Sequence, residues 1–222
     1  MKAPGLSIVI PTLNAASALS GTLAAVGAEA EVVVSDGGSE DSTPALARRL
    51  GARVLRSPRG RGSQLAAGVA AARGPWLLLL HADTRLGPGW TDAVAAHQRE
   101  GEGRAGYFRF ALDSPDPRAR RLERAVAWRC RALALPYGDQ GLLIHRDLLE
   151  RVGGVRPIPL MEDVDLVRRL GRARLAALDA DALTSAAKWE RDGWYRRSAR
   201  NLACLALWHA GVPPRLIARA YG

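Results

Sequence analysis

The sequence predicts an α/β protein built on a doubly wound, mostly parallel sheet with helices on both faces. Short apolar runs alternate with segments of helical period from residue 6 to residue 80, which is the order of strands joined by helical crossovers. Residues 76–80 are apolar throughout, as in a strand buried on both faces. Polar residues follow the strands, at the edge where such sheets bind ligands. A chain of 222 residues, 48% hydrophobic and 24% charged, suits one globular domain.

The first half of the chain alternates between strand and helix. Strands are expected at the short apolar or β-branched runs 6–10, 31–35, 52–55 and 76–80. Pro11 is expected to end the first strand. Helices are expected over 15–26, over 44–50 and from the glycine-punctuated basic loop 59–64 to about residue 73. Right-handed crossovers then bring the ends of these strands to one edge of the sheet.

The second half has a different pattern, with longer and more irregular connections. Residues 84–88 are expected to form a turn, and residues 136–141 a loop. Helices are expected over 90–100, 118–133 and 147–152 and from residue 162 onward, and strands over 106–112, 142–144 and 173–178. A basic, tryptophan-bearing helical tail follows from residue 181. The chain carries no internal repeat or low-complexity linker, so a single domain is expected.

The charge balance is strongly basic. The net charge is +10, from 32 Lys and Arg against 22 Asp and Glu, and nearly all of the basic residues are Arg. Such a surface suits an anionic partner, although a GC-rich genome also produces an Arg- and Ala-rich chain. Aromatic residues make up only 5% and no nucleic-acid recognition motif is present, which argues against a nucleic-acid-binding protein. The two cysteines lack metal-ligand spacing and suggest a reducing compartment.

A cytoplasmic location is expected. The N-terminus runs directly into a strand-like segment without a signal peptide, and no apolar run approaches the ~20 residues of a membrane helix. In the tail, aromatic residues alternate with arginines: Trp189, Arg191, Trp194, Tyr195, Arg196, Arg197, Arg200 and Trp208. Two interpretations are open, peripheral docking on an anionic inner membrane face and a helix packed on the domain with a solvated basic face. The second is favoured.

Two carboxylates are expected at the binding edge of the sheet. Asp36 and Asp83 each follow a predicted strand, near a glycine turn and the arginines of the loop 59–64. Mg²⁺ prefers oxygen ligands and commonly takes one or two protein carboxylates with substrate phosphates, so the pattern indicates a phosphate-ester site. The competing interpretation is that Asp83 only caps the following turn. No G-x-G-x-x-G follows the first strand and no P-loop motif is present, which excludes those two nucleotide-binding classes.

A second acidic pair, Glu162–Asp163, opens a predicted helix. It either complements the helix dipole or supplies a general base that deprotonates an acceptor hydroxyl. Adjacent residues cannot flank a glycosidic bond as the paired carboxylates of an inverting hydrolase do. Asp139 and Gln140 lie in a glycine-flanked loop, by default a turn. His145 lacks a His/Cys cluster around it and is expected to be structural or exposed and not a metal ligand.

Four motifs occur in the same order as the motifs of a known family that the chain resembles. They are SIVIPTLN at 7–14, VSDGGSEDST at 34–43, LHADT at 80–84 and MEDVDL at 161–166. The chain resembles the family-2 inverting glycosyltransferases of the GT-A fold, over nearly its whole length. Three sequence motifs, HADTRL at 81–86, YGDQG at 137–141 and LMEDV at 160–164, are similar to motifs of a bacterial subgroup labelled arsenosugar-biosynthesis-like glycosyltransferases.

The resemblance implies a hexosyltransferase-like enzyme that uses a nucleoside-diphosphate sugar and Mg²⁺ or Mn²⁺. Residues 1–100 would bind the donor, 101–180 the acceptor, and 181–222 would be the tail. Asp163, with Glu162 beside it, would be the catalytic base. Asp83 would bind the metal. The other implied donor-site residues are Pro11, Thr12, Asn14, Asp36, Gly37, Arg61, Gln64 and His81, and the implied acceptor loop is Gly138, Asp139, Gln140 and Gly141. Lys188, Trp189 and Arg191 correspond to a basic-aromatic motif that closes over the diphosphate.

His81 departs from the family pattern, which usually has Asp at this position. The replacement removes a negative charge from the metal site and puts the identity of the metal in question. Transfer would be a single displacement with inversion, in which Asp163 accepts the proton and cations neutralise the leaving group. A sugar-phosphate nucleotidyltransferase is the alternative enzyme, but its glycine- and arginine-rich loop is not found after the first strand.

Overall fold

The computed structural model describes residues 5–221, with side chains to residue 219. The strands are β1 (Leu6–Thr12), β2 (Glu31–Asp36), β3 (Arg53–Arg56), β4 (Trp76–Leu79), β5 (Thr84–Leu86), β6 (Ala105–Leu112), β7 (Leu142–His145) and β8 (Leu175–Thr184). The helices are α1 (Ala16–Val26), α2 (Thr43–Arg49), α3 (Arg61–Ala71), α4 (Trp90–Glu100), α5 (Pro117–Leu133), α6 (Arg146–Arg151), α7 (Glu162–Leu170), α8 (Ala187–Asp192), α9 (Trp194–His209) and α10 (Pro214–Tyr221).

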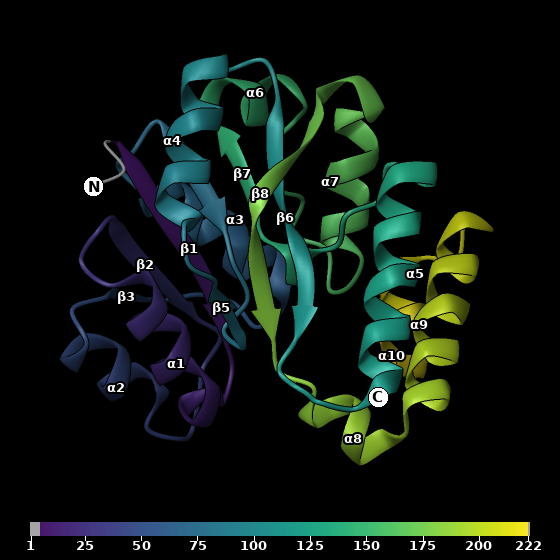
Figure 1. The fold of residues 1–222 in the computed structure, drawn as a ribbon. Helices are drawn as coiled ribbons and strands as arrows, with labels where there is room; N and C mark the ends of the chain where they lie inside the picture. Colours follow the sequence, from purple (N-terminus) through teal and green to yellow (C-terminus); the bar gives the residue numbers. More distant parts are fainter. Residues whose placement is uncertain (1–4, 222) are drawn as a thin grey trace.

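One eight-stranded sheet runs through the molecule in the order β3-β2-β1-β4-β7-β6-β8-β5 (Figure 1). The strands β3, β2, β1 and β4 are parallel, as the alternation of strands and helices predicts. β7 pairs antiparallel with both β4 and β6, while β6 and β8 are parallel. The predicted mostly parallel α/β sheet with a mixed second half is therefore confirmed.

Pro11 lies inside β1, and the expectation that it ends the strand is wrong. The carbonyl of Val9 accepts a hydrogen bond from the Leu80 N–H, so Val9 and its alternate residue Pro11 turn their backbone groups toward β4. β4 ends at Leu79, which pairs with Val9. The missing N–H of Pro11 therefore falls beyond the end of the neighbouring strand, and β1 continues to Thr12 without losing a ladder bond.

The expected turn at 84–88 is also corrected, because residues 84–86 form strand β5. β8 extends to Thr184, well beyond the expected end at residue 178, and its last residues pair with β5 in antiparallel register. The hydroxyls of Thr84 and Thr184 lie 3.0 Å apart on these paired strands. Three residues are too few to show a strand pattern alone, so the pairing depends on the distant partner β8.

Helices cover both faces of the sheet. α1, α2 and α4 pack on one face through residues such as Leu19, Ala47 and Val94, over Ile8, Ile10 and Leu78 of the strands. α3, α6 and α7 pack on the other face, over the alternate strand residues, such as Val9, Leu77 and Ile144. A third cluster joins α5, α8 and α9 to the end of β6, and Figure 1 shows these helices gathered with α10 at one side of the molecule.

This topology sets the place of the site. The ends of β1 and β2 meet in register, Thr12 beside Asp36, and the chain leaves β4 there through His81 and Asp83. Because β7 runs antiparallel to β4, the loop that precedes β7, with Gly138 and Asp139, arrives at the same edge. The donor-side and acceptor-side residues of the sequence analysis are thus brought together at one sheet edge.

Candidate active site

Asp36 organises the loop that follows β2. Its Oδ1 accepts a hydrogen bond from the Thr12 hydroxyl at 3.0 Å, and its Oδ2 accepts the N–H groups of Gly38 at 3.0 Å and Ser39 at 2.9 Å. Burial raises the pKa of Asp36, but the hydrogen bonds from Ser39, Thr12 and Gly38 outweigh it and hold the pKa below its usual range. Both carboxylate oxygens already have partners within the protein, so Asp36 shapes the edge of the site.

Asn14 and Gln64 fix the neighbouring backbone. Asn14 has a left-handed backbone with φ 50°, and its N–H donates to the Ser39 hydroxyl at 2.8 Å. The buried Gln64 amide donates to the Thr12 carbonyl at 2.6 Å. A Cβ on Gly37 would lie 3.0 Å from that amide, so glycine permits the close approach of the loop to α3.

A cleft of about 820 Å³ opens beside these loops. Its walls combine predicted site residues with residues of the C-terminal helices. The lining is Arg61, His81, Asp83, Tyr137, Asp139, Leu160, Met161, Asp163, Val164, Thr184, Lys188, Trp189, Arg197, Asn201 and Cys204. The cleft therefore holds three carboxylates and three basic side chains.

Glu162 and Asp163 have different surroundings although they are adjacent. Met161 has a left-handed backbone with φ 66°, and α7 begins directly after it. Glu162 is 1% exposed and its Oε1 accepts a hydrogen bond from Nε of Arg61. Asp163 lines the cleft, and its Oδ2 lies 3.8 Å from Nη2 of Arg61 and accepts the Gly138 N–H at 2.8 Å. Glu162 thus holds Arg61 in place, while Asp163 faces the space where a substrate would lie.

The charge states of the pair follow from these contacts. Burial raises the pKa of Glu162. Burial acts in the same direction on Asp163, but the Arg61 guanidinium and the Gly138 N–H outweigh it and hold the pKa of Asp163 below its usual range. Asp163 is therefore ionised at neutral pH, the state that a general base requires.

His81 and Asp83 follow β4 on the other side of the cleft. Burial and the Arg61 guanidinium lower the pKa of His81 to about 4, so its imidazole is neutral at physiological pH. Nζ of Lys188 donates to Oδ2 of Asp83 at 2.7 Å. Burial raises the pKa of Asp83, but the charge and hydrogen bond of Lys188, together with weaker contributions from His81 and the backbone, outweigh burial and hold the pKa below its usual range.

Of the two polar residues in the acceptor loop, only Asp139 reaches the cleft. Its Oδ1 is buried and has no hydrogen-bond partner, and burial raises the pKa of Asp139 to about 6. Gln140 is 2% exposed. Its amide donates to the Phe108 carbonyl at 3.0 Å and accepts from the Tyr137 N–H at 3.2 Å, so Gln140 holds the loop instead of facing a substrate.

Two of the three residues that the sequence assigns to the diphosphate line the cleft. Lys188 and Trp189 line it, whereas the Arg191 side chain pairs with Asp192 at 2.8 Å and is absent from the lining. Sequence reasoning missed Arg197, Asn201 and Cys204, which line the cleft from one face of α9. Their spacing of four and three residues is the signal that places them on one helix face.

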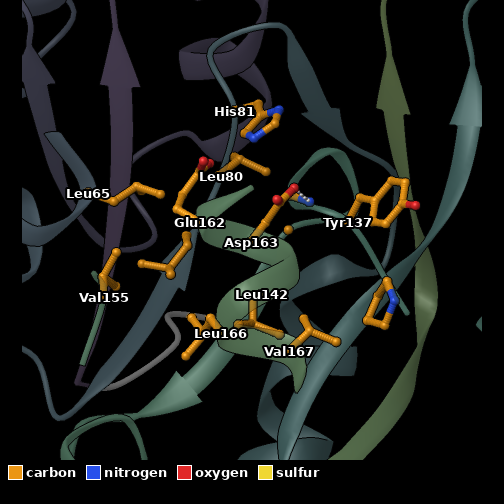
Figure 2. Close-up of a pocket in the computed structure, with 14 residues that line it drawn as sticks. Leu65, Leu80, His81, Tyr137, Leu142, Val155, Glu162, Asp163, Leu166 and Val167 are labelled. Carbon is orange, nitrogen blue, oxygen red and sulfur yellow. Dashed lines mark hydrogen bonds between the residues drawn. The ribbon is translucent and has the colours of Figure 1, made fainter. Parts of the chain in front are cut away.

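An apolar pocket lies next to the cleft. Figure 2 shows His81, Glu162 and Asp163 around its polar end, whereas Leu142, Leu166 and Val167 line the other end. Gly138 is part of this wall, and a Cβ there would lie 2.5 Å from Nε2 of His81 and 3.1 Å from Oδ2 of Asp163. Only glycine lets the loop pass between the two sides of the site.

The cleft offers a donor set for a divalent cation. The imidazole of His81 and the carboxylate of Asp83 are groups of kinds that bind divalent ions, and imidazole nitrogen suits first-row transition-metal ions better than Mg²⁺. Glu102, His145 and Asp147 form a separate group whose ligand atoms lie within 4.8 Å of one another. His145 pairs with Trp76 at the start of β4, so this group lies at the opposite edge of the sheet from Asp83.

Comparison with solved structures defines the fold class. A mannosyltransferase from Pyrobaculum calidifontis, solved with GDP-Man and Mn²⁺, is 22% identical with a TM-score of 0.65, covering 90% of this chain and 62% of that chain. Glucosyl-3-phosphoglycerate synthase from Mycobacterium tuberculosis, solved with Mn²⁺, UDP and glucosyl-3-phosphoglycerate, is 21% identical with a TM-score of 0.57 over 81% of this chain and 70% of that one. The GT-A fold predicted from the motifs is confirmed.

The family follows from the sequence comparison. The profile of glycosyl transferase family 2 matches residues 7–152, more than half of the chain, and the chain therefore belongs to this family. An uncharacterized glycosyltransferase of M. tuberculosis is 35% identical over 102 residues, 46% of this chain and 47% of the relative. A succinoglycan biosynthesis protein of Rhizobium meliloti is 36% identical over 96 residues, 39% of this chain and 28% of the relative. The chain thus spans half or less of these relatives.

Proposed function

We propose that the chain transfers a sugar from a nucleoside-diphosphate sugar to an acceptor hydroxyl, with inversion at the anomeric carbon. The observation that carries this proposal is the convergence of Asp83 and Asp163 on one cleft at the binding edge of the sheet. The solved chains with this fold include complexes with UDP, GDP-Man and Mn²⁺. The acceptor is not identified by these comparisons, and membership in the arsenosugar-like subgroup stays a prediction from its motifs.

In this proposal Asp163 is the general base. It is ionised, it faces the cleft, and the Gly138 N–H and Arg61 fix its carboxylate. An acceptor hydroxyl that donates to Asp163 is deprotonated as its oxygen attacks the anomeric carbon from the face opposite the leaving group. Glu162 is a positioning residue, because it reaches the cleft only through Arg61.

The leaving diphosphate requires cations around it. Asp83 and His81 would hold a divalent metal ion, which supplies charge neutralisation to the leaving group when bound. Mn²⁺ is proposed over Mg²⁺ because one of the two protein ligands is an imidazole. Lys188, whose Nζ donates to Asp83 at 2.7 Å, adds a further positive charge.

The experiment that tests this function uses a panel of UDP-, GDP-, ADP- and dTDP-sugars with Mn²⁺, with water as the default acceptor. Release of nucleoside diphosphate indicates sugar transfer. A nucleotidyltransferase would instead release pyrophosphate from a nucleoside triphosphate and a sugar 1-phosphate, which are supplied together in a parallel reaction. Asp163→Asn is expected to lower release by about 10² or more, with donor binding retained. Glu162→Gln, which keeps the shape of the neighbouring carboxylate, is expected to lose less. Equal activity of Asp163→Asn and the unmodified protein contradicts the assignment of the base.

We also propose that helices α5, α9 and α10 contact an anionic membrane. Among the described residues, six of the seven exposed large apolar side chains lie on α5, α9 and α10: Trp128, Leu133, Tyr195, Leu202, Leu207 and Leu216. The exposed residues of the same helices include Arg121, Arg124, Arg215 and Arg219. Apolar side chains among arginines suit the surface of a bilayer with acidic lipids. In the described chain, no helix is both long and apolar enough to cross a bilayer.

Flotation with liposomes tests this contact. Binding to vesicles with 30% phosphatidylserine at low salt is expected, with loss of binding in phosphatidylcholine vesicles or at high salt. Leu202→Ser together with Leu207→Ser is expected to reduce binding, whereas Leu50→Ser, at an exposed leucine outside these helices, is expected to leave it unchanged. Failure to float with anionic vesicles at low salt contradicts the proposal.

A further inference from the structure

The cation nearest the proposed metal ligand is a lysine, in a chain that hardly uses lysine. Of the 32 basic residues other than histidine, only Lys2 and Lys188 are lysines. Lys188 lies in the cleft with its Nζ 2.7 Å from Oδ2 of Asp83. An ammonium group is a compact point charge on a flexible stem, whereas a guanidinium is a planar fork. A compact ammonium on one carboxylate oxygen therefore sits where a metal ion would otherwise bind.

We infer that Lys188 is a tethered cation that competes with the divalent metal ion for Asp83, and that the nucleoside diphosphate relieves this competition by offering Lys188 a phosphate partner. The inference rests on the proposed function, because it requires Asp83 to be a metal ligand. It adds a role for Lys188 in coupling the binding of metal to the binding of the donor.

The structure shows why the movement can be confined to the side chain. α8 is anchored by Trp189, which is buried against Phe110 with ring centroids 6.3 Å apart and has the Arg197 guanidinium over its ring. The segment before α8 is tied to the loop after β4, since the Ser185 N–H donates to the Asp83 carbonyl at 3.2 Å. The Lys188 side chain itself is 50% exposed. The helix thus stays in place while the long side chain can turn into the cleft.

The burial of Asp83 explains why two cations compete for its carboxylate. The side chain of Asp83 is only 18% exposed, and a carboxylate that is mostly buried needs a positive partner. In the free protein Lys188 supplies it. When a diphosphate enters, Lys188 gains a more highly charged partner, and Asp83 becomes available to the metal ion. Metal and nucleotide binding are therefore positively coupled through Lys188, and by linkage each strengthens the other equally.

The test measures Mn²⁺ binding directly, from the electron paramagnetic resonance signal of free Mn²⁺, with and without UDP or GDP. Without nucleotide, Lys188→Met is expected to bind Mn²⁺ about five- to tenfold more tightly than the unmodified protein, because no side-chain cation has to leave Asp83. The gain in Mn²⁺ affinity on adding the nucleotide is expected to be smaller in Lys188→Met. Asp83→Asn is expected to lose the site, which separates it from any binding at His145.

Arg109→Gln is the matched control. It removes the cation from another ion pair, Nε of Arg109 with Oδ1 of Asp181 at 2.5 Å, on β6 and β8 and outside the cleft. Its Mn²⁺ affinity is expected to equal that of the unmodified protein. Lys188→Arg keeps the charge and is expected to keep weak Mn²⁺ binding without nucleotide.

The outcomes separate the inference from the proposed function. Equal Mn²⁺ affinity in Lys188→Met and the unmodified protein, with a nucleotide-dependent site still present, overturns the inference and leaves the function intact. If neither protein binds Mn²⁺ at a site sensitive to Asp83→Asn, with or without nucleotide, the metal role of Asp83 is lost and the inference with it.

Discussion

The surroundings of Asp139 oppose its negative charge. Burial raises its pKa to about 6, and its Oδ1 is without a hydrogen-bond partner. An acid whose folded-state pKa is raised holds its proton more tightly in the folded than in the unfolded chain. Its contribution to stability is therefore lost as the pH rises from about 4, the unfolded pKa, to about 6.

The expected result is that Asp139→Asn stabilises the protein at pH 7 and has little effect at pH 4. The free energy of unfolding at pH 7 should rise by about 1–2 kcal/mol, because the neutral amide no longer has to ionise inside the cleft. Thermal unfolding at several pH values measures this. Asp92→Asn, at an exposed residue of α4, serves as the control. A stabilisation that is equal at pH 4 and pH 7 would contradict the assignment.

His81→Asp is expected to change the metal preference. Replacing the imidazole by a second carboxylate gives an all-oxygen donor pair, which Mg²⁺ prefers. The ratio of the Mg²⁺ to the Mn²⁺ dissociation constant, measured by calorimetry with a bound nucleoside diphosphate, should fall severalfold. A ratio that does not change would show that His81 does not contact the metal ion.

Single residues were predicted from sequence where a short motif carries them. Asp83 and Asp163 were placed at the binding edge by the strand ends and by motif order, and both line the cleft. The pairing of Lys188 with Asp83 joins positions 105 residues apart, and no local pattern encodes it. The same holds for Gln140, since its buried contacts with Phe108 depend on how the loop packs against β6.

At the scale of elements, the 3₁₀ turn Gly138–Gln140 is the most constrained part of the site. A Cβ on Gly138 would lie 2.5 Å from Nε2 of His81 and 3.1 Å from Oδ2 of Asp163, closer than such atoms pack. The turn, the loop after β4 and the start of α7 are therefore held at a separation that only glycine allows.

Gly138→Ala is expected to destabilise the protein by about 1–3 kcal/mol through this overlap. Its loss of activity is expected to be larger than the destabilisation alone would cause, because the added methyl group displaces Asp163. Gly103→Ala is the control, since a Cβ there would meet nothing within 4 Å. Thermal unfolding and release of nucleoside diphosphate measure the two effects. Equal stability and activity of the two alanine variants would contradict this account of the turn.

Most helices and strands were predicted from the hydrophobic pattern, because a continuous apolar run such as that of β4 is compatible with few other structures. Two were not. Pro11 was expected to end β1 because proline cannot donate to a sheet, yet the neighbouring strand ends first. β5 was expected to be a turn because its pairing is supplied by the end of β8, a distant segment. Both errors concern the strands with which β1 and β5 pair, and a local sequence pattern carries no information about pairing between distant strands.

At the scale of the whole molecule, ligand binding should raise the thermal stability of the folded protein. A ligand that binds only the folded state stabilises it by ~2.7 kcal/mol at a hundredfold excess over Kd. One nucleoside diphosphate among UDP, GDP, ADP and dTDP is expected to raise Tm in the presence of Mn²⁺, and by less after chelation. Asp83→Asn should remove the metal-dependent part of the shift. No shift with any nucleotide would contradict the proposed donor class.

The sequence predicted the sheet and the donor edge better than the shape of the cleft. The helices after residue 181 were expected to be a tail, yet α9 forms one wall of the cleft through Arg197, Asn201 and Cys204. Their helical spacing was visible, but the direction of that face depends on how α9 packs against α8 and α5. The wall that α9 contributes is therefore the part of the cleft that the sequence alone did not reveal.

The scarcity of lysine gives the cleft a distinctive chemical handle. Lys2 and Lys188 are the two lysines of the chain, and among the residues that the structure describes Lys188 is the lysine that lines the cleft. Amine-directed acylation followed by peptide mass mapping therefore reports the occupancy of the cleft from the modification of Lys188. Reagents that usually modify a protein surface at many places act here as a footprint of a single side chain.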